Sequence, residues 1–317
     1  TNCANPDTAN RAPVLSNKIR SLFIWTICAR AGICASLRTV IFGRRFALMK
    51  SMVILAGAVL CAGSSAAQFN YDEAKVPKYT LPPALKMADG KPVKSVKAWE
   101  MQRRPEVLEL FKREVFGRAP GRPKRMSFHL VEESPKALGG LAHRRQVEVR
   151  FSGKADGPRM TMLIYRPAKA RGAVPTFLTL NFRGNHTVHA DPAIRLPHSW
   201  VRGRTKGETV NNRATEKGRG VAANRWAIET ILKRGYALAT IYYGDIDPDF
   251  HDDWKNGVHA LYPKPKPDGW GSVATWAWGL SRALDYLETD RAIDHTRVAV
   301  MGHSRLGKTS LWAGAAD

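Results

Sequence analysis

The stretch Arg297-Val-Ala-Val-Met-Gly-His-Ser-Arg-Leu-Gly-Lys-Thr309 decides the fold, because an apolar strand runs through a glycine directly into a helix. Its last eight residues match the spacing G-x-x-x-x-G-K-T, which is the pattern of a phosphate-binding loop. The same residues also place Ser304 on a sharp strand-to-helix turn, which is typical of a serine nucleophile. Gly302 would permit that turn, and Gly307 would let the helix pack closely. The loop therefore indicates either a nucleotide-binding protein or a serine hydrolase.

Upstream of this loop, apolar strands alternate with amphipathic helices. The expected strands are 174–182, 236–243 and 297–301, and the expected helices are 224–233 and 272–288. The second helix carries one apolar stripe, formed by Trp276, Leu280, Ala283 and Leu287. This alternation predicts an α/β fold in which a mostly parallel sheet carries helices on both faces. Polar loops follow all three strands, so we expect a site where the carboxyl ends of the strands meet.

The part of the chain before the alternating region has a different pattern. Residues 68–97 are rich in proline and lysine and are expected to form an extended arm on the domain. Residues 143–151 and 159–165 are predicted to form a β-hairpin. A helix is predicted over 98–116, ended by Gly117. Its apolar face would consist of Trp99, Val107, Leu108, Phe111 and Val115.

The residues around Ser304 resemble those of a known enzyme family. Gly302-His-Ser-Arg-Leu-Gly-Lys308 is similar to the G-x-S-R-x-G-K nucleophile elbow of the glucuronoyl esterases, carbohydrate esterase family 15, which have the α/β-hydrolase fold. Its second glycine comes one residue later than in the common G-x-S-x-G pentad. The resemblance covers about 95–317. Upstream stretches that resemble bacterial members are Asn181-Phe-Arg-Gly-Asn-His186, Gly235-Tyr-Ala-Leu-Ala-Thr-Ile-Tyr-Tyr-Gly-Asp-Ile-Asp-Pro-Asp249 and Gly269-Trp-Gly-Ser-Val-Ala-Thr-Trp276.

The resemblance implies a secreted serine carbohydrate esterase that cleaves glucuronoyl esters between glucuronoxylan and lignin alcohols. Ser304 would attack the uronoyl carbonyl and form an acyl-enzyme. Arg305 would help form the oxyanion hole with its side chain and backbone N–H, where a guanidinium stabilises charge that exists only in the transition state. Lys308 would bind sugar hydroxyls. No metal or organic cofactor is implied. An exported protein also meets no steady supply of ATP, which disfavours the phosphate-binding interpretation.

Two other functions stay open at this point. An acetyl-xylan esterase could use the same scaffold, because a fold alone does not select a substrate. A non-catalytic polysaccharide-binding protein is the alternative from a different class.

The catalytic base and its orienting acid are missing from the expected place. In α/β-hydrolases both follow the serine in chain order, yet the only acidic residue after Ser304 is Asp317, and no histidine follows it. The chain is therefore expected to be an α/β-hydrolase domain that is incomplete at its C-terminus and inactive as given. The upstream histidines are expected to be loop residues rather than the base; they include His186, His189, His251, His259 and His303.

The N-terminal region predicts export. Met49-Lys50 is followed by an apolar run at 52–62 and small residues at 63–67, so 49–67 is predicted to be a signal peptide. Residues 1–48 would then have no structural role, and 98–317 would be the N-terminal part of the catalytic domain. The apolar run is too short to span a bilayer, which predicts a secreted or periplasmic protein without a membrane anchor. The exported part would have no disulfide, because the chain's four cysteines all precede it: Cys3, Cys28, Cys34 and Cys61.

The charge balance, 50 Lys and Arg against 27 Asp and Glu, normally suggests a polyanionic partner. Part of the excess lies in residues 1–48, and no nucleic-acid partner is expected. The basic loop at 195–225 is expected to be a solvated insertion or a surface for acidic polysaccharide.

Two further groups of residues have ordinary structural interpretations. Asp245, Asp247 and Asp249 alternate as in a calcium loop, but the glycine and glutamate that such a loop requires are absent, so a turn after the strand is predicted. The remaining tryptophans of interest are expected in the core; they are Trp270, Trp276 and Trp278.

Overall fold

The structure is a computed structural model that describes residues 70–203 and 207–317. These residues form two compact units, one containing residues 70–93 and the other containing the described residues from 94 to 317. The expected upstream segment at 1–48 and the expected signal peptide at 49–67 lie outside the described residues.

The smaller unit has little regular structure. A 3-10 turn spans Glu73–Lys75, and the Asp72 side chain caps it by accepting a hydrogen bond from a backbone N–H at 3.0 Å. Its described backbone, residues 70–93, is otherwise largely irregular. The following helix α2 (Val96–Ala98) begins just before the expected end of that arm.

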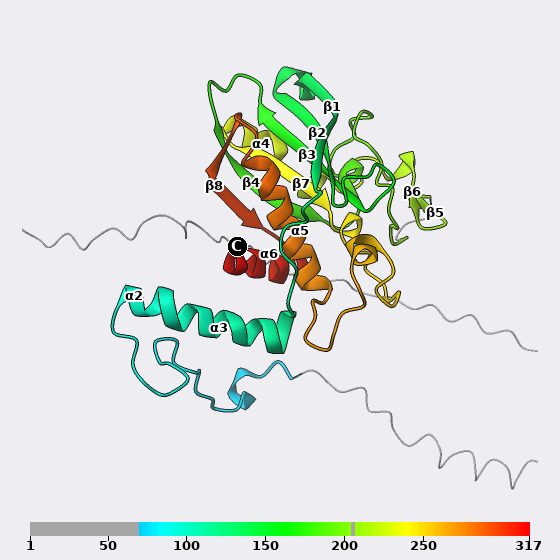
Figure 1. The fold of residues 1–317 in the computed structure, drawn as a ribbon. Coiled ribbons are helices and arrows are strands. Elements are labelled where there is room, and N and C mark those ends of the chain that lie inside the picture. Colours follow the sequence, from blue (N-terminus) through cyan, green and yellow to red (C-terminus); the bar gives the residue numbers. More distant parts are fainter. Residues whose placement is uncertain (1–69, 204–206) are drawn as a thin grey trace, which may run out of the picture. The chain divides into compact units, whose positions relative to one another are not determined.

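The centre of the larger unit is a six-stranded sheet (Figure 1). The strand order is β1-β2-β3-β7-β4-β8, with antiparallel pairs from β1 to β7 and parallel pairs where β4 lies between β7 and β8. A separate two-stranded hairpin consists of β5 (Thr209–Val210) and β6 (Arg213–Ala214). The strands of the central sheet are β1 (Ser127–Ala137), β2 (Ala142–Arg150), β3 (Arg159–Pro167), β4 (Val174–Asn181), β7 (Ala237–Tyr242) and β8 (Ile293–Met301).

The strand predictions are confirmed for five of the six strands in the central sheet. The short strands β5 and β6 were not predicted. Strands β2 and β3 form the expected antiparallel hairpin, in which Val147 is paired with Met162. Strands β4, β7 and β8 are parallel, as the alternating pattern predicted. Strand β1 was not predicted, and it extends the antiparallel side of the sheet. The α/β class is therefore confirmed with a mixed sheet rather than a mostly parallel one in the described part of the chain.

Helices cover both faces of this sheet (Figure 1). Helices α5 (Ser272–Leu287) and α6 (Arg305–Ala316) contribute to the core on one face, and α4 (Ile228–Lys233) contributes to the core on the other. Successive side chains of β3 enter the two cores in turn, so Met162 lies in the first core and Leu163 in the second. The helix predicted over 224–233 is shorter in the structure, where α4 begins at Ile228. The first residues of the predicted range belong to a 3-10 turn, Ala223–Arg225.

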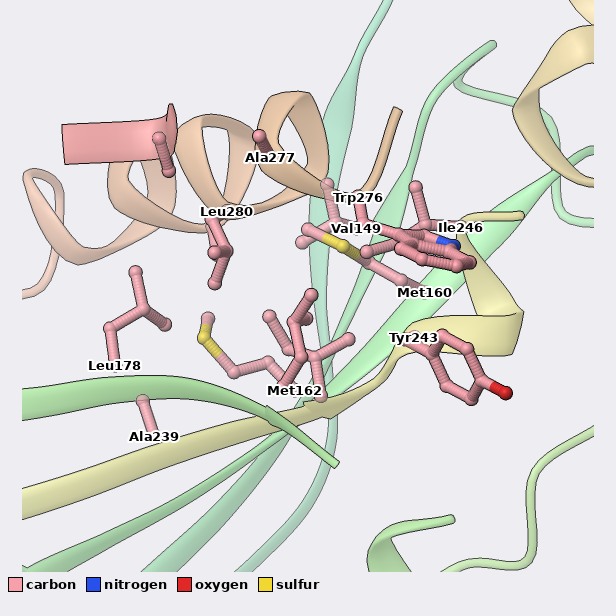
Figure 2. Packing of buried hydrophobic residues seen from close by; sticks show 14 of the residues in the cluster. Val149, Met160, Met162, Leu178, Ala239, Tyr243, Ile246, Trp276, Ala277 and Leu280 are labelled. Atoms are coloured by element: carbon pink, nitrogen blue, oxygen red, sulfur yellow. The ribbon is translucent and has the colours of Figure 1, made fainter. Parts of the chain in front are cut away.

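Helix α5 supplies the expected apolar stripe. Trp276, Leu280, Ala283 and Leu287 are all buried. Figure 2 shows Trp276 and Leu280 lying against methionines of β3, with Ile246 beside the indole ring. The indole N–H of Trp276 also donates to the Asp247 carbonyl at 2.8 Å. Helix α5 therefore fixes the loop that follows β7. The prediction that Trp270, Trp276 and Trp278 belong to the core is confirmed, because all three are buried.

The helix predicted over 98–116 exists, but its apolar face is only partly buried. It runs from α2 through a π-helical turn at Trp99–Arg103, then α3 (Arg104–Phe111), and ends in a second π-helical turn at Lys112–Phe116. Gly117 ends it with φ 82°, as predicted. Within the described residues Phe111 is 42% exposed and Val115 is 60% exposed. The contacts that do form include stacking of the Phe116 ring on Trp312 of α6.

Candidate active site

The turn between β8 and α6 has the geometry of a nucleophile elbow. Strand β8 ends at Met301 and helix α6 begins at Arg305, so three residues connect a strand to a helix. Ser304 occupies the N-cap position with φ 56° and ψ −128°, a conformation that costs a residue with a side chain about 1–3 kcal/mol. The Ser304 side chain is exposed. The strained backbone therefore places Ser304 at the surface between the strand and the helix.

Gly302 makes this turn possible, because the helix returns across it at very short range. A Cβ atom on Gly302 would lie 2.1 Å from the Leu306 carbonyl oxygen and 2.6 Å from the Ser310 hydroxyl. A Cβ atom on Gly307 would lie 3.4 Å from the Gly302 carbonyl oxygen, which is an ordinary contact. The packing therefore requires glycine at 302, whereas the close packing expected at Gly307 leaves room for a methyl group.

The first turn of α6 brings the three expected site residues together. Ser304, Arg305 and Lys308 are all exposed. The Ser304 carbonyl accepts a hydrogen bond from the Lys308 N–H at 3.2 Å, so Lys308 lies one helical turn beyond the serine on the same side of the helix. N–H groups in the first turn have no acceptor within the helix, and the helix dipole favours negative charge there. This end of α6 can therefore stabilise an oxyanion beside Ser304.

The Arg305 guanidinium is held by a residue that the sequence analysis did not place in the site. Arg305 donates to the carboxylate of Asp249, which lies in the loop after β7. Tyr243 also donates its hydroxyl to the Asp249 carboxylate at 3.0 Å. The sequence contained a signal for this contact, because Asp249 ends an alternating aspartate series at the predicted rim. By itself, the series indicates only a turn after the strand.

The other two aspartates of the series point to different partners. Asp245 accepts hydrogen bonds from the Ser199 hydroxyl at 2.5 Å and from the Thr161 N–H at 3.3 Å. Asp247 is buried, and burial raises its pKa to about 7, although a hydrogen bond with Ser272 partly opposes this rise. Burial also raises the pKa of Asp245. The predicted turn is confirmed by a 3-10 turn over Tyr243–Asp245. Among the described residues, the three carboxylates form no group that could hold a metal ion.

No described histidine is hydrogen-bonded to the Ser304 side chain. His186 and His259 are buried, and burial lowers the pKa of each to about 4. The His259 ring accepts or donates a hydrogen bond with the Thr275 hydroxyl at 2.9 Å. His303 is exposed, and its ring contacts the edge of Phe182. The contacts described for His259 and His303 are therefore with Thr275 and Phe182.

Several arginines of the basic loop at 195–225 donate hydrogen bonds to backbone carbonyls of the protein. Arg219 donates to the carbonyls of Asp191 and Ile194 at 2.9 and 2.7 Å. Arg202 donates to the Asp249 carbonyl at 2.8 Å. Among the residues that the structure describes, no cluster of His, Cys, Asp and Glu side chains could hold a metal ion. The loop is therefore partly an internal structural element rather than a uniformly solvated insertion.

The mixed sheet, the helices on both its faces and the strained serine turn define an α/β-hydrolase. A family model described as glucuronyl esterase, fungi, matches residues 221–317. The curated protein carbohydrate esterase MZ0003, from an unknown prokaryotic organism, is 53% identical over 254 residues, which are 78% of this chain and 58% of that protein. The chain belongs to the glucuronoyl esterase family, carbohydrate esterase family 15.

Solved structures agree with this assignment. A promiscuous CE15 esterase from the marine bacterial metagenome is 52% identical with a TM-score of 0.71, covering 79% of this chain and 63% of that chain. A glucuronoyl esterase from Solibacter usitatus is 46% identical with a TM-score of 0.71, covering 77% of this chain and 62% of that chain. The chain thus spans about three fifths of the length of these relatives. In the described ranges, no helix is both long enough and apolar enough to cross a membrane.

We predict that the elbow depends on Gly302 and not on Gly307. Gly302→Ala should destabilise the fold by about 2 kcal/mol or more, because the new methyl group would overlap backbone of α6. Gly307→Ala should leave stability unchanged or raise it by up to about 1 kcal/mol, because alanine favours a helix interior. Urea unfolding of the product of the complete reading frame measures both. Equal losses in the two variants would contradict this account of the turn.

We also predict a pH dependence from Asp247. Its pKa is higher in the folded chain, about 7, than the ordinary 3.8, so the folded chain retains this proton more tightly. The stability contributed by this group is therefore complete below pH 3.8 and is lost as the pH rises towards 7, by at most about 1.4 kcal/mol per pH unit. Asp247→Asn stays neutral, so its advantage in unfolding free energy over the wild type should grow across this range.

The matched control for this prediction is Asp253→Asn. The Asp253 carboxylate is exposed, and its hydrogen bond with Lys264 holds its pKa below the ordinary value. Its replacement should show no growing advantage between pH 4 and 7. A constant difference between Asp247→Asn and the wild type over that range would show that the Asp247 carboxyl titrates normally.

Proposed function

We propose that the protein to which this chain belongs is a serine carbohydrate esterase that cleaves glucuronoyl esters between glucuronoxylan and lignin alcohols. The observation that carries the proposal is the strained, exposed Ser304 at the N-terminus of α6, with Arg305 next to it. A serine in this conformation serves little structural purpose, because the strain is relieved by any glycine. Membership in the glucuronoyl esterase family supports the uronoyl substrate.

In the proposed reaction, the Ser304 hydroxyl oxygen attacks the uronoyl carbonyl carbon while a general base accepts the hydroxyl proton. The carbonyl electrons move to oxygen, and the resulting oxyanion is stabilised by the Arg305 guanidinium and backbone N–H. Collapse of this intermediate breaks the bond to the alcohol, which leaves with the proton. Water then hydrolyses the acyl-enzyme by the same steps. The proposal assigns the base to no described residue.

Lys308 is the proposed residue for binding the sugar. Its side chain starts one helical turn beyond Ser304 and is exposed on that side of α6. An ammonium group carries three hydrogen-bond donors on a flexible stem, which suits hydroxyl groups of a ring attached to the reacting carbonyl. Lys308 would therefore act on substrate binding rather than on the charge of the transition state.

An acetyl-xylan esterase activity is the second candidate. One solved relative, 52% identical, is described as a promiscuous esterase. An elbow of this kind stabilises the oxyanion of any carboxylic ester, so the choice between acyl groups lies in contacts beyond Ser304.

We also propose export of the protein through the predicted signal peptide at 49–67.

We predict that Ser304→Ala abolishes hydrolysis of benzyl and methyl glucuronate by the product of the complete reading frame. The loss in kcat should be at least about 10⁴-fold, because the nucleophile itself is removed. Release of glucuronic acid from the glucuronate esters and release of acetate from acetylated xylan should be measured in parallel. Unfolding curves are the control for folding. Retained turnover in Ser304→Ala would refute the nucleophile, and hydrolysis of acetyl esters alone would favour the second candidate.

We predict a different kinetic signature for Lys308→Ala. The KM for glucuronate esters should rise about tenfold with kcat changed less than about threefold, because the ammonium group binds ground state and transition state alike. An aryl acetate, which has no sugar hydroxyl groups, provides the matched control and should be hydrolysed with unchanged KM. A similar change for both substrates would show that Lys308 supports the elbow rather than the sugar.

A further inference from the structure

The Asp249 carboxylate lies at the centre of a cluster of donors beside the candidate active site. Arg305 and Tyr243 both donate to its Oδ2 atom. The Arg202 guanidinium lies 3.7 Å from the same oxygen and donates to the Asp249 carbonyl at 2.8 Å. Asp249 is thus bound through its carboxylate and its backbone, and its side chain is only 19% exposed.

The fold explains why these residues meet. Asp249 follows β7 and Arg305 follows β8, and these two strands lie on either side of β4 in the parallel part of the sheet. Carboxyl ends of parallel strands open at the same edge, so the two loops approach each other there. The contact between Asp249 and Arg305 therefore joins the elbow to the loop after β7.

Tyr243 gives this cluster a rigid support. Its ring packs edge-on against Trp276 of α5 and against Phe182, which follows β4. Figure 2 shows the ring at the margin of the buried cluster, with the hydroxyl directed away from it. Burial raises the pKa of Tyr243 above its ordinary value, so the hydroxyl stays protonated and donates. The Asp249 carboxylate is therefore anchored from the core side.

We propose that Asp249 is a positioning residue, supported by Tyr243, that holds the Arg305 guanidinium where the oxyanion forms. This inference rests on the proposed function of Arg305. The Arg305 side chain is 44% exposed, and an unpartnered arginine on the surface would sample many rotamers. A donor stabilises a transition state most effectively when it is already oriented, because no reorganisation is then needed during the reaction. Asp249 supplies that orientation without touching the substrate.

A double-mutant cycle on glucuronate ester hydrolysis tests the proposal, using the product of the complete reading frame. Asp249→Asn keeps the shape of the side chain and removes its charge. It should lower kcat about tenfold with KM changed less than about twofold, because Arg305 contributes only in the transition state. Asp249→Glu keeps a carboxylate and should restore kcat to within about threefold of the wild type. In an Arg305→Ala background, Asp249→Asn should change kcat less than about twofold.

The controls separate positioning from a general structural role. Asp253→Asn removes an exposed carboxylate that is paired with Lys264 in the same connection between β7 and α5, and it should leave kcat unchanged. If Asp249→Asn does not fold, Tyr243→Phe removes only one hydrogen bond from the carboxylate. Its smaller loss of kcat, about two- to fivefold, should also disappear in the Arg305→Ala background.

Three results would overturn the proposal. These are an unchanged kcat in Asp249→Asn, losses from Asp249→Asn and Arg305→Ala that multiply in the double variant, and a failure of Asp249→Glu to restore turnover. The first two results count against the positioning role of Asp249 when Ser304→Ala is inactive and Arg305→Ala lowers kcat, because these two variants establish the proposed function. If Arg305→Ala has no effect on turnover, the proposed role of Arg305 fails instead, and the positioning role of Asp249 fails with it.

Discussion

The close approach of α6 to the end of β8 is the constraint on which the candidate site depends. The Leu306 carbonyl oxygen and the Ser310 hydroxyl occupy the space where a side chain at position 302 would lie. Because the helix begins so close to the strand, the chain must reverse over three residues, and Ser304 takes the positive φ that this reversal requires. Exposure of the hydroxyl and its place at a helix N-terminus both follow from that geometry.

The sheet gives the elbow its neighbours. With β4 between β7 and β8, the loops after all three strands share one edge, and aromatic side chains fill the space between them. Tyr243 after β7 contacts Phe182 after β4, and Phe182 contacts the His303 ring within the elbow. Helix α5 fixes the loop after β7 through Trp276, which contacts the Tyr243 ring and donates to the Asp247 carbonyl. The site is thus built on rigid elements, which suits groups that must be oriented before a reaction.

Local patterns in the sequence predicted the elements that carry this site. The elbow at 302–308, the stripe of α5 and the three parallel strands all have periodicities or turn residues that act over short distances. Strand β1 was missed because Pro135 and several charged residues interrupt its pattern, which an edge strand tolerates. The exposed face of the helix around Phe111 could not be predicted either, because amphipathicity does not show what packs against a face.

The contact between Asp249 and Arg305 illustrates what lies beyond local patterns. The two residues are separated by 56 positions, and their loops meet because β7 and β8 both run parallel to β4 and end at the same edge of the sheet. Strand order is a property of the whole sheet, and no spacing in the sequence encodes it. The same limit applies to Tyr243, whose hydroxyl reaches Asp249 only because its ring is wedged among Trp276 and Phe182.

Locating the covalent intermediate would show whether the turn at Ser304 presents a nucleophile. The product of the complete reading frame, quenched with acid during turnover of a glucuronate ester with a good leaving group, can be digested and mapped by mass spectrometry. We expect a glucuronoyl group on the peptide that contains Ser304, attached to that serine. A glucuronoyl group attached to another residue would contradict it.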